Sequence, residues 1–235
     1  MQELKRLIEI RQSARGIFDP ERAIPAEDME KILEAARWAP TAHNMQNFEI
    51  VVVDDKQLLT AISEIKTPPN LTFIRENYPQ LSFTEDELRW RKTGIMGTMF
   101  PKSWQTPDPD PEDIKNEDRS AYMATQIVSS PAILFVLYDP SRRAPASEGD
   151  FLGIVSLGCA MENMWLMANS LGIGVHIVSS LSGKKVAAEI AKLLNVPDKF
   201  SIAFSMRLGY PVTPVHYLRV RRDRDDFVHH NGFRK

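Results

Sequence analysis

The chain has 235 residues, 43% of them hydrophobic and 26% charged, which is typical of a water-soluble globular protein. Its formal net charge of -2 and isoelectric point near 6.2 argue against nucleic acid as a partner. The one cysteine, Cys159, excludes an intrachain disulfide and a cysteine-built metal site. The charged N-terminus is unlike a signal peptide, so we expect a cytoplasmic protein.

The first predicted helix has Leu4, Leu7 and Ile8 at helical spacing and ends near Arg11–Arg15, with Gly16 as its stop. The segment reads RQSAR, and its hydrogen-bond donors are Arg11, Gln12, Ser13 and Arg15. Because the planar guanidinium fork suits phosphate, this segment is a candidate phosphate site. Basic residues also favour the C-terminus of a helix on electrostatic grounds alone, so the simpler interpretation stays open.

A second helix is predicted from Pro25 to Trp38, followed by the polar loop Ala39–Asn47 and a strand at Phe48–Val53. A loop rich in amides and hydroxyls between a helix and a core strand is a good place for ligand contacts. The alternative is a turn that satisfies only its own backbone.

After a helix at Gln57–Ile65, the composition changes over Lys66–Glu117, where prolines are frequent but aromatic residues persist. A disordered linker would lack those aromatics. We therefore expect an excursion with sparse secondary structure that serves as a lid or as an arm around a partner subunit.

The chain then alternates between predicted helices and strands. Helices are expected at Asp118–Ser129 and Lys184–Leu194, and strands at Pro131–Tyr138 and Phe200–Leu208. Between them, Gly153–Leu171 is apolar on nearly every side, which predicts a buried helix, and Glu162 and Asn163 argue against a membrane span. Gly172 is its expected stop, and Val175–Val178 is the next strand. Either this pair is plain core, or it is a dimer-core helix whose strand ends at a ligand beside Ser179 and Ser180.

Several catalytic motifs are absent from the sequence. No G-x-G-x-x-G opens a helix after a strand, and no P-loop, nucleophile elbow or H-E-x-x-H occurs. His229 and His230 lack companion ligands, so no metal site is expected. Candidate anion and hydroxyl sites without acid–base machinery indicate that a bound cofactor carries the chemistry.

Four segments, in order, resemble the FMN-dependent nitroreductase family. Arg11–Arg15 resembles its R-x-S-x-R signature, and Ala36–Gln46 resembles its A-R-x-A-P-S-x-x-N-x-Q segment. Gly158–Gly174 resembles its central helix, and Leu208–Pro211 with the tail Arg221–Phe227 resembles its C-terminal signature.

The resemblance implies an α+β fold with three α/β/α layers, a mainly antiparallel sheet and an intertwined homodimer. It further implies a C-terminal tail, at about 212–235, that embraces the partner. We expect one domain, 1–235, that includes the lid or excursion at about 66–117. By position, Arg11, Gln12, Ser13 and Arg15 would hold the FMN phosphate and ribityl end. The residues expected to reach the flavin, from the other subunit, are Pro40, Thr41, Ala42 and Asn44. Ser179 and Ser180 would lie near the flavin ring, and Arg221 would return to the phosphate.

The implied function is ping-pong transfer of hydride from NAD(P)H through FMN to a nitroaromatic, quinone or activated alkene. The flavin itself carries the hydride, so no side chain is assigned as catalytic. In the deiodinase branch a lid glutamate is followed four residues later by tyrosine, but Glu85 and Glu87 are followed by Arg89 and Arg91, which argues against that branch. A flavin-fragmenting enzyme, a flavin carrier or redox sensor without turnover, and a flavin-free α/β protein remain alternatives.

Overall fold

The computed structural model describes residues 2–66, 71–100, 105, 116–145, 149–213 and 217–233. The chain forms two compact units, one of Met1–Thr67 with Tyr122–Val215 and one of Pro68–Ala121 with His216–Lys235. Of the predicted excursion, Lys66–Glu117, residues 67–70, 101–104 and 106–115 lie outside the described residues.

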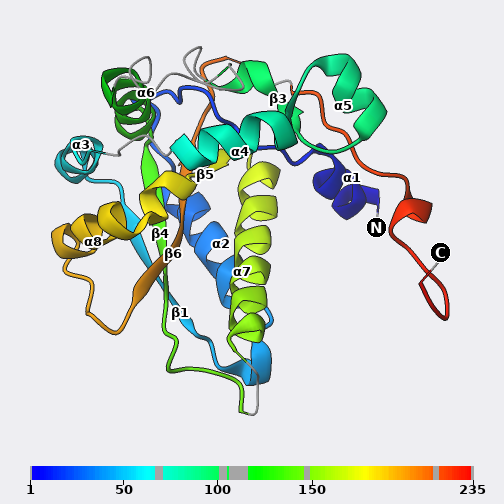
Figure 1. The fold of residues 1–235 in the computed structure, drawn as a ribbon. Coiled ribbons are helices and arrows are strands. Elements are labelled where there is room, and N and C mark those ends of the chain that lie inside the picture. The colour runs from blue at the N-terminus through cyan, green and yellow to red at the C-terminus, as the bar shows by residue number, and fades with distance from the viewer. Residues whose placement is uncertain are drawn as a thin grey trace. The chain divides into compact units, whose positions relative to one another are not determined.

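The larger unit is built on a four-stranded antiparallel sheet (Figure 1). Its strands, in spatial order, are β1 (Phe48–Val53), β4 (Ala132–Tyr138), β6 (Ser201–Gly209) and β5 (Gly174–Ile177). Strand β4 is buried at six consecutive positions, Ala132 to Leu137, because both of its faces are covered. Such an uninterrupted apolar run is what a doubly covered central strand requires.

Helices cover both faces of this sheet and complete three layers. Two of them, α2 (Ala26–Arg37) and α7 (Phe151–Ser170), share one hydrophobic core with the sheet. The opposite core joins the sheet to α3 (Lys56–Ser63), α6 (Asn116–Val128) and α8 (Lys184–Leu193). The expected α+β fold with α/β/α layers is therefore confirmed.

Helix α7 is the long central helix, but it is not buried on every side. Its inner face, which includes Ala160, Met164 and Ala168, is fully buried, whereas Phe151 is 70% and Ile154 is 61% exposed. The expectation that this helix is buried on every side is therefore wrong for the single chain. Among the described helices, α7 alone is long and apolar enough to span a membrane, and 39% of that stretch is buried. Its inner face belongs to the core of the larger unit.

The first helix is shorter than expected. Helix α1 covers Gln2–Ile10, and Arg11–Arg15 is extended instead of forming the end of the helix, while Gly16 lies beyond it. The physical reason is tertiary: Ser13 forms a parallel bridge with Val175, and the Ala14 N–H donates to the Val175 carbonyl at 2.7 Å. Gly172, with φ of 74°, directly follows the C-cap residue of α7 and is the left-handed helix stop that the sequence predicts.

The smaller unit contains more secondary structure than expected. It holds α4 (Leu71–Leu81), α5 (Glu85–Arg91) and a two-stranded parallel sheet of β2 (Ser82–Phe83) and β3 (Ile95–Met96). Thr84 and Glu87 form a capping box that starts α5, a local signal that proline frequency obscured. Within this unit, Lys92 pairs with Asp223 and so joins the excursion to the C-terminal tail.

Candidate cofactor-binding site

The segment Arg11–Arg15 meets the free edge of β5 through a single parallel bridge between Ser13 and Val175. Gly174 permits this approach, because a Cβ there would lie 3.0 Å from both the Ala14 Cβ and the Pro211 Cγ. The Arg15 carbonyl accepts hydrogen bonds from Gln126 Nε2 at 2.5 Å and from the Tyr122 hydroxyl at 3.4 Å. The backbone that presents the donor side chains is therefore fixed by β5 and by α6.

The Arg11 side chain points to α7. Its Nε lies 3.0 Å from Glu162 Oε1, and its guanidinium stacks over the Trp165 ring at 4.7 Å. These two contacts hold the guanidinium in one orientation. An anion that binds here would share Arg11 with Glu162.

The loop Pro40–Asn47 has an unusual backbone. His43, Asn44 and Gln46 have φ values of 51°, 54° and 46°, in the left-handed region that costs non-glycine residues energy. Two hydrogen bonds hold this shape. Within the loop, Thr41 Oγ1 accepts the Gln46 N–H at 3.1 Å, and the Ala42 N–H donates to Ser156 Oγ on α7 at 3.0 Å.

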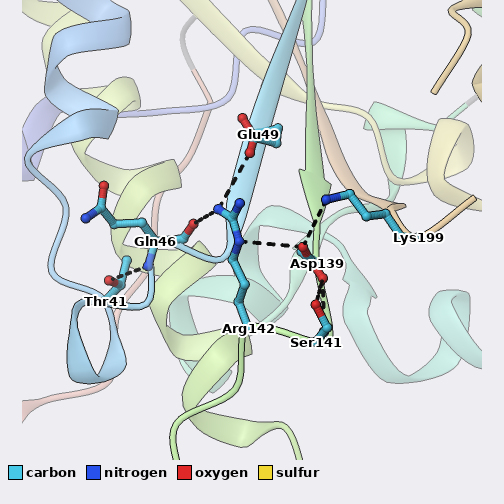
Figure 2. A network of polar contacts seen from close by, with 7 residues as sticks. All are labelled: Thr41, Gln46, Glu49, Asp139, Ser141, Arg142 and Lys199. Carbon is cyan, nitrogen blue, oxygen red and sulfur yellow. Dashed lines mark hydrogen bonds and ion pairs between the residues drawn. The ribbon is translucent and has the colours of Figure 1, made fainter. Parts of the chain in front are cut away.

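A network of polar contacts centred on Arg142 supports the backbone of this loop (Figure 2). Arg142 donates to the Gln46 carbonyl at 3.0 Å and lies 3.6 Å from both Glu49 and Asp139. The Asp139 carboxylate is buried and accepts from the Ser141 hydroxyl at 2.5 Å. This bond is the main reason that the pKa of Asp139 is lowered, and the charges of Lys199 and Arg142 lower it further. The sequence did not single out this network, because its members are far apart in the chain.

The predicted hydroxyls follow β5. Ser179 and Ser180 lie in a 3-10 turn, Ser179–Ser182, directly after the strand. Ser179 is exposed, and the Ser180 hydroxyl lies 4.0 Å from Met123 Sδ. Arg221 belongs to the smaller unit, where it donates to the Val220 carbonyl at 2.7 Å. Its role toward a phosphate stays a prediction.

The structure brings together only part of the predicted set. Ser13 lies beside Val175, at the end of the sheet where Ala132 pairs with Leu208. The Pro40–Asn47 loop leads into β1 at the opposite end, where Phe48 pairs with Tyr138 (Figure 1). From Leu208 to Ser201 the intervening strand rises roughly 23 Å. Within one chain, therefore, the phosphate segment and the loop do not form one site.

Two further residues near the segment escaped the sequence analysis. His176 on β5 has its pKa lowered to about 3, first by burial and then by the charges of Arg207 and Arg15. Burial lowers the pKa of Arg207 on β6 to about 9. The available signal was an arginine, the one charged residue, within the strand Phe200–Leu208.

The fold agrees with comparisons to known proteins. The sequence pattern described as the Nitroreductase family matches residues 8–210. This chain belongs to the nitroreductase family. That membership confirms the predicted resemblance and the expected oxidoreductase class.

Relatives carry names of the same kind. A protein of Archaeoglobus fulgidus, named as a candidate NADH dehydrogenase/NAD(P)H nitroreductase, is 26% identical over 90% of this chain and 87% of its own length. A nitroreductase of Bacteroides fragilis with bound FMN superposes with a TM-score of 0.60 at 20% identity, covering 99% of this chain and all of the other. The NADPH:FMN oxidoreductase of Vibrio harveyi, complexed with NAD+, gives 0.62 at 20% identity, covering 99% and 79%.

Proposed function

We propose that this nitroreductase-family chain is an FMN-dependent oxidoreductase that takes hydride from NAD(P)H. The observation that carries the proposal is the segment Arg11–Arg15, which is held against β5 by the Ser13–Val175 bridge, on the strand that leads into the turn Ser179–Ser182. The arginine, amide and hydroxyl donors of this segment suit a phosphate. The turn that carries Ser179 and Ser180 follows β5, the strand that the segment contacts. These features fit a phosphate-bearing flavin, which the names of the relatives support.

The chain's own residues have distinct roles in this proposal. Arg11, Gln12, Ser13 and Arg15 hold the phosphate and ribityl end, with Arg221 as an additional cation. The flavin ring would be bordered by Pro40, Thr41, Ala42, Asn44, Ser179 and Ser180. When bound, FMN supplies the two-electron chemistry by which hydride from NAD(P)H is taken up and passed to a nitroaromatic, quinone or activated alkene. The strained loop, fixed by Arg142, keeps its donors in one position.

We also infer that the active form is a homodimer in the cytoplasm. The phosphate segment and the Pro40–Asn47 loop lie at opposite ends of one sheet, so a shared site needs a loop from a second chain. The outer face of α7 exposes Phe151, Leu152, Ile154 and Val155. An apolar face of this kind is typical of a subunit interface. The tail at 212–235 would embrace the partner, and the excursion at 66–117 would cover the site as a lid within a single domain.

The details of α5 support the reductase over the deiodinase branch. Glu85 pairs with Arg89, and Glu87 is used in the capping box with Thr84. Both carboxylates that would have to grip an amino-acid substrate are thus engaged within the helix.

The test is anaerobic addition of NADPH or NADH to the FMN-loaded protein. We expect the flavin to bleach, and a nitroaromatic or quinone to restore its full absorbance. Bleaching with neither nicotinamide would support a flavin carrier without turnover. Permanent loss of the flavin would support a fragmenting enzyme, and a protein that takes up no FMN would overturn the proposal.

A further inference from the structure

A completely buried arginine lies on β6, the strand that pairs with β5 on the side away from the candidate phosphate segment. Arg207 on β6 is 0% exposed. Its Nε donates to Ser130 Oγ at 2.7 Å, its Nη2 donates to Ser129 Oγ at 3.4 Å, and its guanidinium stacks over the Phe18 ring at 4.7 Å. Among the described residues, no carboxylate forms an ion pair with it. A buried charge with only neutral partners is costly, so its presence needs an explanation.

The third partner of Arg207 is His176 on the neighbouring strand. Arg207 Nη1 lies 3.2 Å from His176 Nδ1. Because arginine can only donate, Nδ1 must accept, and the imidazole is then neutral with its proton on Nε2. Arg207 therefore makes His176 a fixed donor. The residue before it, Val175, is the one that bridges to Ser13.

The same network reaches the segment through α6. The Ser129 and Ser130 hydroxyls donate to the Gln126 carbonyl at 3.1 and 2.7 Å, and Gln126 Nε2 donates to the Arg15 carbonyl. The Arg15 side chain is also close enough to His176 for its charge to act on the imidazole. The cations Arg207 and Arg15 and the fixed donor His176 are thus concentrated at β5, where Val175 bridges to Ser13, and the charges acting on His176 are both positive.

We propose that Arg207, through His176 and the Gln126 network, forms the inner wall of an anion subsite whose ligand is the phosphate of the cofactor. Arg207 does not touch the ligand; it is a positioning residue that supplies positive potential and orients its neighbours. The uncompensated charge costs stability in the free protein, and the bound phosphate offsets that cost. This inference rests on the proposed function, because it takes FMN as the source of the phosphate.

The test compares FMN with riboflavin, which lacks the phosphate, on the wild type, Arg207→Met and Arg207→Lys. For Arg207→Met we expect an FMN Kd about tenfold higher, with the riboflavin Kd changed less than about twofold. The free variant should melt at the same or a higher temperature than the free wild type. Arg207→Lys keeps the charge and should retain most of the preference for FMN. Arg37→Met, at an exposed arginine on α2, is the matched control and should change neither affinity.

The outcomes separate the two proposals. Equal weakening of FMN and riboflavin by Arg207→Met would assign Arg207 a purely structural role and overturn the subsite. If Arg207→Met does not fold, Arg207→Gln makes the same comparison. If the wild type binds no FMN, the proposed function fails, and inorganic phosphate then tests the subsite alone. A melting temperature raised by phosphate in the wild type but not in the variant supports the subsite, and no difference between them overturns it.

Discussion

At the scale of single residues, Arg11 shows how a side chain can serve both the fold and a ligand. It pairs with Glu162 and stacks on Trp165, yet it belongs to the extended donor segment on β5. The pair is partly exposed, so its own contribution to stability is small. The constraint on the guanidinium is the more useful effect, because a preorganised donor loses less entropy when an anion binds.

We predict that Arg11→Ala raises the FMN Kd about ten- to a hundredfold, since a charged hydrogen bond contributes roughly 1.5–3 kcal/mol. Fluorescence titration of the apoprotein with FMN measures this change. Arg6→Ala, at an exposed arginine on α1, is the matched control and should bind like the wild type. Unchanged affinity in Arg11→Ala would remove Arg11 from the phosphate site.

His176 gives the protein a pH-dependent stability. Its pKa is about 3 in the folded chain and 6.5 as the ordinary value, so the unfolded chain binds the proton more tightly. Stability is therefore complete above about pH 6.5 and falls as the pH drops toward about 3. Between about pH 7 and about pH 5 we expect the wild type to lose about 2 kcal/mol more than His176→Gln. Urea unfolding at the two pH values measures this difference, and equal losses in both proteins would contradict the buried neutral imidazole.

At the scale of elements, the Pro40–Asn47 loop depends on a neighbour distant in sequence. Three left-handed residues within four positions would not persist without external support. That support comes from Arg142, which donates to the Gln46 carbonyl and bridges Glu49 and Asp139 (Figure 2). The loop is thus positioned by the segment that follows β4 as much as by its own sequence.

We predict that Arg142→Ala releases the loop and lowers stability by about 1 kcal/mol, because one hydrogen bond of a partly exposed cation is lost. Hydrogen exchange of the loop amides should accelerate, while exchange in β4 stays as in the wild type. Arg142→Lys retains the charge near Asp139 and should restore part of the protection. Lys185→Ala, at an exposed cation on α8, serves as the control. Unchanged loop exchange in Arg142→Ala would show that the local Thr41 bonds suffice.

At the scale of the whole molecule, the outer side of α7 is an apolar surface that the single chain leaves exposed to solvent. The inner side packs into the core, and the outer side leaves large apolar residues in contact with solvent. Beside it, a groove of about 770 Å³ between α1, α2 and α7 is lined by Leu4, Trp38 and Leu166, among others. A second copy would bury this apolar surface and bring its own Pro40–Asn47 loop to the first chain's donor segment.

We therefore predict that Ile154→Glu on the outer face of α7 converts a dimer into a monomer. A buried, unpaired carboxylate at the centre of an apolar interface is strongly unfavourable. Light scattering coupled to size-exclusion chromatography gives the mass, and FMN content should fall together with dimerisation. Ala188→Glu, at an exposed position on α8, is the control and should stay dimeric. A dimer in Ile154→Glu would place the interface elsewhere.

The sequence by itself determined the order of most elements. Periodicity and end signals placed α2, α3, β4, α8 and β6 within one or two residues, and Gly172 marked the end of α7, because these features depend on contacts between near neighbours. The resemblance of Arg11–Arg15 and Ala36–Gln46 to family signatures was likewise local, and the family and fold are confirmed. The capping box at Thr84 was equally local, but the prolines of the excursion obscured it.

The tertiary structure decided everything that depends on residues distant in sequence. It joined the segment after α1 to the sheet through a bridge between Ser13 and Val175, because backbone groups at a strand edge are satisfied by pairing. It buried Arg207 against His176 and the α6 serines, and it placed Arg142 behind a strained loop. Hydrophobic periodicity cannot reveal such contacts, since it records which side of an element is apolar but not which polar groups meet across the fold.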